Sequence, residues 1–188
     1  MNKIFIGLFF VSINFHLDIG SVRIGLAPDF IGYILIFLGM RELEGLSGHL
    51  ADNKKICIPA AVFSGILYSL DLTGLSAVGE EIDLKFGVLL LCEIIISIIS
   101  LKVLYNIVKG IEDIEHRFLC NLNYEKLIFI WKAISAAVII TYVCLIFVSA
   151  LALFAAIANL ILTIILLYQF NITRKRYFMI VNQQEVNQ

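Results

Sequence analysis

The feature that most constrains this chain is an apolar stretch of 44 residues, Leu127 to Phe170, in which Lys132 is the only charged residue. As an α-helix rising about 1.5 Å per residue, the stretch would be about 66 Å long, roughly twice the hydrocarbon thickness of a bilayer. The stretch must therefore fold back on itself. A turn near Ser149 divides it into two membrane spans of about 20 residues each.

The composition extends this conclusion to the whole chain. Hydrophobic residues make up 61% of the 188 residues and charged residues only 15%, whereas soluble domains are about half apolar and a quarter charged. The 14 Lys and Arg nearly balance the 15 Asp and Glu, which argues against a nucleic-acid partner and against disorder. We expect an all-α membrane protein whose main partner is the lipid bilayer.

Six spans account for the apolar segments of a single integral membrane domain covering residues 1–188. The first segment has an apolar core of only 12 residues, so whether it crosses the membrane fully stays open; no signal-peptide cleavage site follows it. Pro28 suits the first turn of a helix, which predicts a helix from Pro28 to Arg41 after an irregular stretch from Asp18 to Ala27. The expected spans are 3–17, 24–41, 56–72, 86–104, 127–147 and 150–170.

The distribution of basic residues predicts the orientation. With the N-terminus in the cytoplasm, 11 of the 14 Lys and Arg lie in inner segments, and only Arg23 and Lys85 lie in outer ones. This is the bias of cytoplasmic loops, so both termini are expected on the cytoplasmic side of the cell membrane. The segment 102–126 is amphipathic and predicts a cytoplasmic helix between spans four and five, bending near Gly110 to lie on the membrane surface.

Glu93 is the ionisable residue placed deepest in an apolar run, eight residues into its span. A carboxylate at that depth is costly, so it must face the bundle interior, water or a partner. Asn159 lies at a similar depth in the last span. The pair is interpreted as a hydrogen bond that joins two helices, as a proton or cation site, or as a contact with a partner subunit.

A second polar group is expected toward the outer side. Asp29 follows Pro28 in the first turn of a helix, Asp71 ends the third span, and Arg23 precedes Asp29 by six residues. A helix cap with an Arg23 counter-ion explains Asp29, and an interfacial position explains Asp71. A ligand or ion vestibule and a catalytic pair of aspartates are the alternatives.

The glycines at 25, 32 and 39 are spaced by seven residues. Gly32 and Gly39 share nearly one face of a helix, which predicts close approach of another backbone; a flexible gating helix is the alternative.

No motif supports an enzyme, metal or cofactor. The four cysteines have no paired spacing, and the three histidines fall in different polar stretches. The Gly-x-Ser-Gly string at 45–48 is similar to the nucleophile motif of rhomboid-type proteases, but spans five and six contain no histidine. We expect no catalytic, metal-binding or cofactor-binding residue.

The string Pro-Asp-Phe-Ile-Gly-Tyr-Ile-Leu at 28–35, after a short first hydrophobic segment, resembles a loosely defined group of small bacterial multi-pass membrane proteins. The likeness covers about the first quarter of the chain. The group has no assigned activity, so the resemblance implies a class of protein and no reaction.

Two functions fit these observations. The first is a small transport or permeation module for an ion, a proton-coupled solute or a lipid, with Glu93, Asn159, Asp29, Asp71 and Arg23 as its polar site. The second is an accessory subunit or membrane sensor that binds another membrane protein, or a homo-oligomer. An enzyme at the outer leaflet is a third and weaker hypothesis.

Overall fold

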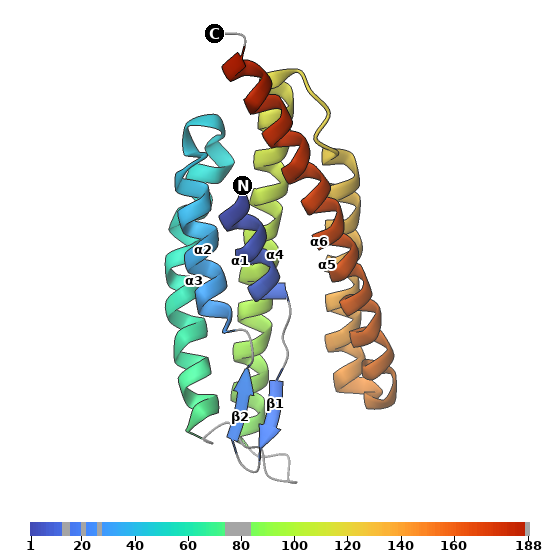
Figure 1. Cartoon of the computed structure of the whole chain (residues 1–188). Helices are drawn as coiled ribbons and strands as arrows, with labels where there is room; N and C mark the ends of the chain where they lie inside the picture. Colours follow the sequence, from blue (N-terminus) through green and yellow to red (C-terminus); the bar gives the residue numbers. More distant parts are fainter. Residues whose placement is uncertain (13–15, 20–21, 26–27, 74–83, 187–188) are drawn as a thin grey trace.

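The computed structural model describes residues 1–12, 16–19, 22–25, 28–73 and 84–186. Its helices run back and forth along one axis (Figure 1). In chain order the elements are α1 (Asn2–Ser12), β1 (His16–Ile19), β2 (Val22–Gly25), α2 (Asp29–Arg41), the 3-10 helix η1 (Glu44–Leu46), α3 (Gly48–Leu72), α4 (Leu84–Phe118), α5 (Tyr124–Phe147) and α6 (Ser149–Val186).

The two ends of the bundle hold different elements (Figure 1). We call the end with β1, β2 and the α5–α6 turn the hairpin end. The opposite end holds η1, the α4–α5 connection and the C-terminal part of α6, and we call it the basic end. The start of α1 and the end of α6 both lie toward the basic end, because α1 runs away from it and α6 runs toward it.

Four of the described helices are long and apolar enough to cross a membrane, so the chain is a helical membrane protein. They are α3, α4 from Gly87, α5, and α6 from Leu151 to Gln183. The chain reverses between α5 and α6 at Val148, whose φ of −146° and ψ of 80° are not helical. This is the position at which the length of the apolar stretch predicted a turn.

The N-terminal quarter differs from the two helical spans that we expected at 3–17 and 24–41. The helices α1 and α2 have 11 and 13 residues, so they are about 17 and 20 Å long and shorter than a bilayer core. The first expected span ended at residue 17 as a helix, and this is wrong: α1 ends at Ser12, and β1 begins at His16. The helix expected after Pro28 is confirmed, since α2 begins at Asp29 and ends at Arg41.

The stretch expected to be irregular contains an antiparallel hairpin instead. His16 pairs with Gly25, and the register continues to Ile19 opposite Val22. Each strand has only four residues, too few for a periodic pattern to stand out in the sequence. Pairing gives the backbone N–H and C=O groups of both strands partners, which favours a hairpin over an irregular coil next to a membrane.

Close contact between α1 and α2 depends on glycine, as the positions of Gly32 and Gly39 predicted. A Cβ atom added at Gly32 would lie 2.8 Å from the carbonyl oxygen of Gly7, and one added at Gly39 would lie 2.8 Å from the backbone nitrogen of Ile4. Real Cβ atoms essentially never come that close to backbone. Gly7, on the facing helix, is a third member of this contact that the sequence analysis did not include.

The amphipathic segment after the fourth predicted span does not lie on a membrane surface. Helix α4 continues through Gly110 to Phe118 in the same direction (Figure 1). Its apolar face is buried against protein, with Ile107, Ile111 and Ile114 at most 2% exposed. Gly110 itself lies against the side chain of Leu50 in α3. The predicted amphipathic helix is confirmed, but its apolar face packs against the bundle and not against a membrane surface.

Burial is distributed unevenly along the bundle. On α4 the buried residues begin at Val103, and on α5 they end at Ile134, so both groups lie toward the basic end. Toward the hairpin end, large apolar side chains are exposed on all four long helices. Examples are Ile66 on α3, Leu91 and Ile98 on α4, Ile146 and Phe147 on α5, and Leu153 and Phe154 on α6. Such a belt is expected to face lipid.

Candidate polar cavity within the helix bundle

A cavity of about 450 Å³ lies among α1, α2, α4, α5 and α6. This volume is within the range of small-molecule sites. Much of the lining is apolar, but polar side chains reach the cavity from α1, α2, α4 and α6. They are Ser12, Asp29, Tyr33, Ser97, Ser100, Asn159 and Thr163. Polar groups within a membrane bundle mark binding sites and pathways, so this cavity is the candidate site.

The ends of two short helices place the first polar groups. Ser12 is the last residue of α1, and Asp29 is the first residue of α2. Pro28 precedes Asp29 with φ −63° and ψ 119°, an extended conformation that the proline ring allows and that starts the helix. Asp29 therefore lies among the backbone N–H groups that begin α2, which have no partner within the helix.

Tyr33 lies one turn further along α2. Its side chain is only 1% exposed, and its hydroxyl hydrogen-bonds to the side chain of Ser100 in α4. A buried tyrosine normally needs such a partner for its hydroxyl. The bond connects α2 to α4 at the wall of the cavity.

Ser97 and Tyr142 connect α4 to α5 on the hairpin side of the cavity. Their hydroxyl oxygens lie 2.8 Å apart, and the Tyr142 hydroxyl donates to the main-chain oxygen of Glu93 at 3.1 Å. Because each hydroxyl has one proton, Ser97 must be the donor to Tyr142. The oxygen of Ser97 can then accept a hydrogen bond from a donor in the cavity.

Helix α6 contributes Asn159 and, one turn later, Thr163, which is 8% exposed. The amide oxygen Oδ1 of Asn159 is buried and accepts no hydrogen bond from any residue that the structure describes. A buried polar atom without a partner costs free energy. A guest in the cavity that donates a hydrogen bond to Oδ1 would recover this cost.

The predicted polar residues separate into two groups. Asp29 and Asn159 both line the cavity, although the sequence analysis had grouped Asn159 with Glu93. Glu93 is exposed on α4 and is not among the lining residues; it lies one turn before Ser97. Asp71, next to the end of α3, does not line the cavity either. Arg23 is in β2, opposite Asp18, and its side chain lies outside the described part of the chain.

Sequence reasoning missed Ser12, Tyr33, Ser97, Ser100 and Thr163. A signal for four of them was present, because the polar residues of the cavity recur three or four residues apart: Asp29 with Tyr33 on α2, Ser97 with Ser100 on α4, and Asn159 with Thr163 on α6. Residues with this spacing share one face of a helix. Three polar faces directed toward one another indicate a common interior site.

Metal chemistry has no visible basis in the described ranges. No group of three or more His, Cys, Asp or Glu residues there could hold a metal ion, and the four cysteines are separate free thiols. Ser47, from the protease-like string, is 6% exposed and donates a hydrogen bond to the Asp113 carboxylate at 2.5 Å. Its hydroxyl therefore connects the start of α3 to α4.

A second hollow, of about 520 Å³, lies at the basic end where α4 passes into α5. Its lining is largely acidic and comprises Glu112, Glu115, His116, Leu119, Cys120, Tyr124 and Glu125. Leu119 has a left-handed backbone (φ 48°) and is 94% exposed.

Comparison of the chain with protein-family models, with curated proteins and with solved structures found no match. The fold and the cavity therefore define the class by themselves: a small helical membrane protein with a partly open polar cavity among its helices.

Proposed function

We propose that this chain is a small transport or permeation module and that the cavity holds the ion or solute that it passes. The observation that carries the proposal is the set of seven polar side chains that four helices direct into one cavity. Polar groups are expensive within a bilayer, and a cavity of this kind is a common reason for them.

The chemistry of the lining favours a cation or a protonated solute. Asp29 offers carboxyl oxygens, Asn159 offers a buried amide oxygen that lacks a donor, and the oxygen of Ser97 can accept a hydrogen bond. Oxygen ligands suit small hard cations and N–H or O–H donors. No Lys or Arg is among the described lining residues, so an anion would find no opposite charge there.

We propose that the basic end faces the cytoplasm, that the membrane is a bacterial-type cell membrane, and that the chain crosses it six times. The support for this orientation is the excess of Lys and Arg at that end. Helix α1 of about 17 Å with β1 of about 13 Å approaches the thickness of a bilayer core, and β2 with α2 does the same. Reporter tags at both termini should be accessible only from the cytoplasmic side; tags on opposite sides would contradict the orientation.

The test of transport is flux through purified protein in sealed vesicles. Proteoliposomes containing a pH-sensitive dye are given a potassium gradient and valinomycin, which sets a voltage that drives protons. Wild-type protein should acidify the interior faster than empty vesicles, and Asp29→Asn should reduce the rate about tenfold because it removes the titratable acid that lines the cavity. The same vesicles report sodium or potassium permeation when the gradient is changed.

The matched control is Asp71→Asn, which removes an acid from the end of α3 without touching the cavity. Its flux should equal that of the wild type. Glu93→Gln measures whether the acid one turn from Ser97 contributes, and full flux in that variant would remove Glu93 from the pathway. Equal flux in wild type, Asp29→Asn and empty vesicles, for protons and for both cations, would reject the proposal for these ions.

A second candidate function is that of an accessory subunit or sensor, and the acidic hollow at the basic end favours it. Glu112, Glu115 and Glu125 surround the exposed Leu119, so a basic partner segment with an apolar residue would match both features. A partner that co-purifies stoichiometrically, and that Leu119→Asp or Glu125→Lys releases, would support this function. A persistent monomer after gentle purification would argue against it.

A further inference from the structure

The three consecutive basic residues of α6, Arg174, Lys175 and Arg176, make different contacts. Arg176 donates from Nη1 to the main-chain oxygen of Asn121 at 3.1 Å and to Oδ1 of Asn123 at 3.0 Å. It therefore fixes α6 to the connection between α4 and α5. Arg174 and Lys175 instead line a groove between α1 and α6, of about 740 Å³, together with Asn2, Ile6, Phe178 and Met179.

The groove is basic and is not neutralised by neighbouring acids. The Arg174 guanidinium lies over the ring of Phe5, 4.5 Å from its centroid, and Phe5 in turn stacks on Phe170. In the part of the chain that the structure describes, neither Arg174 nor Lys175 forms an ion pair.

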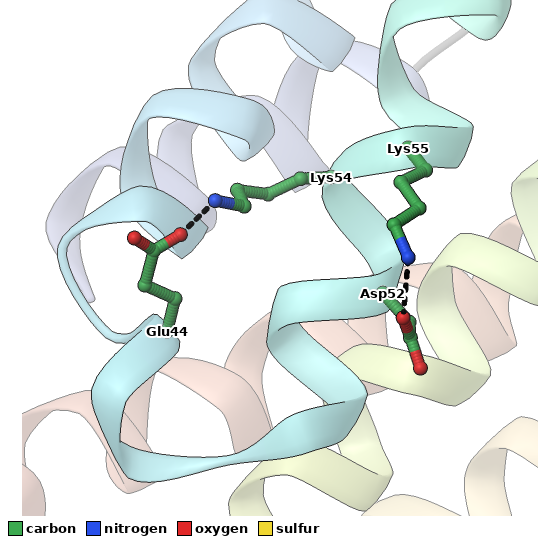
Figure 2. Close-up of polar contacts among 4 residues, drawn as sticks. All are labelled: Glu44, Asp52, Lys54 and Lys55. Carbon is green, nitrogen blue, oxygen red and sulfur yellow. Dashed lines mark hydrogen bonds and ion pairs between the residues drawn. The ribbon is translucent and has the colours of Figure 1, made fainter.

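Three lysines at this end have acidic partners. Figure 2 shows Lys54 of α3 reaching back to Glu44 of η1, and Lys55 pairing with Asp52 on its own helix. Lys3 pairs with Glu42. The two groove residues differ from these lysines, so their charges are available to an external anion.

The walls of the groove are apolar and exposed. Ile6 is 44% exposed and Met179 is 58% exposed, and Phe9, one turn beyond Ile6 on α1, is 45% exposed. The groove lies where the apolar run of α6 gives way to its basic residues after Phe170. At this boundary a membrane changes from acyl chains to headgroups.

We propose that this groove binds an anionic phospholipid of the leaflet at the basic end. The phosphate would contact Arg174 and Lys175, and an acyl chain would lie along Ile6 and Phe9. Basic pockets beside membrane helices are suited to anionic headgroups, and the apolar wall supplies the contact that a free anion could not use. The inference does not depend on what the cavity carries.

The experiment is a lipid titration of the purified protein in a nonionic detergent, with bound lipids counted by native mass spectrometry. Dioleoylphosphatidylglycerol should bind at one saturable site, and dioleoylphosphatidylcholine should bind much more weakly. The double variant R174Q/K175Q should bind phosphatidylglycerol about 20-fold more weakly, because each basic residue near an anionic surface strengthens binding roughly fivefold. Since Arg174 also contacts Phe5, the exposed single variant K175Q is measured as well and should lose about fivefold.

The matched control is K54Q/K55Q, which removes the same charge from the same end of the bundle but from lysines that already have acidic partners. Its affinity for phosphatidylglycerol should stay within about twofold of the wild type. An equal loss in this control would show general attraction to basic protein and overturn the proposal. Competition by inorganic phosphate at the lipid's own concentration would also overturn it, because the site would then bind an anion and not a lipid.

Discussion

The two ends of the bundle are held together in different ways. At the basic end, side chains of one element repeatedly bond to the backbone of another. Examples are Asn53 to the carbonyl of Val103, Trp131 to that of Leu101, Thr173 to that of Leu122 and Arg117 to that of Gly45. At the hairpin end, Tyr142 joins α5 to α4 beside a cavity, and apolar side chains point outward.

The difference follows from the solvent at each end. Lipid is as apolar as leucine, so burying an apolar side chain between helices gives little driving force within the membrane. Tight packing and hydrogen bonds must hold the helices, and in this chain both are concentrated toward the basic end. Away from the basic end the bundle is left able to hold a cavity, which full packing would fill. The basic end fixes the architecture, and the candidate site lies between it and the hairpin end.

The largest effect is expected from the α1–α2 contact. Gly39→Val places a branched side chain where even a Cβ atom lies 2.8 Å from the Ile4 backbone nitrogen, so the two helices must separate. We expect a loss of about 3 kcal/mol in the free energy of unfolding. Thermal unfolding in detergent, followed by Trp131 fluorescence, measures it. Gly87→Val is the control, since nothing lies within 4 Å of a Cβ at Gly87; equal losses in both variants would contradict the proposed packing role.

A somewhat smaller effect is expected at Asn53. Its side chain is fully buried, donates to the Val103 carbonyl at 2.9 Å and accepts from Asn106 at 3.2 Å. Asn53→Ala leaves the Asn106 amide buried without its partner, so we expect a loss of about 2 kcal/mol. A double-mutant cycle with Asn106→Ala measures the coupling between the two side chains. Independent, additive losses would show that this pair does not link α3 to α4; the exposed Asn182 provides a control substitution to Ala.

Part of this fold could be predicted from the sequence. The fold-back of 127–170 followed from length alone, because no membrane accommodates a 44-residue helix across its core. The close approach at Gly32 and Gly39 followed from helical spacing. The packing of α4 against Leu50 could not be predicted, because the amphipathic stripe is the same whether it covers protein or a membrane surface.

Part of the candidate site could also be predicted from the sequence. Asp29 and Asn159 are conspicuous because an acid and an amide are rare in apolar runs. Ser97, Ser100 and Thr163 are not conspicuous, since hydroxyls in membrane helices commonly bond to their own backbone, as Ser135 does to Trp131 and Thr141 does to Ala137. Only the arrangement of the helices distinguishes a hydroxyl that faces a cavity from one that serves its own helix.

A modest effect is expected at the hairpin end. Tyr142→Phe removes the bonds to Ser97 and to the Glu93 carbonyl, and interhelical hydrogen bonds in membranes contribute about 0.6 kcal/mol on average. The loss in unfolding free energy should therefore be well below that of Asn53→Ala. Tyr68→Phe is the matched control, because Tyr68 contacts Phe30 through its ring, which the substitution keeps. A loss at Tyr142 as large as that at Asn53 would remove the contrast between the two ends.

The smallest effect is expected from the ion pair between Lys3 and Glu42 at the basic end. The hydrogen bond from Lys3 holds the pKa of the Glu42 carboxyl below its usual value of 4.5. The pair therefore stabilises the fold above about pH 4.5, and this contribution disappears as the pH falls through the lower pKa of the folded state. Because both side chains are about half exposed, we expect a difference in melting temperature of only about 1 °C between wild type and Glu42→Gln at pH 7. The two melting temperatures should converge by about pH 3, and a difference that grows toward low pH would contradict the assignment.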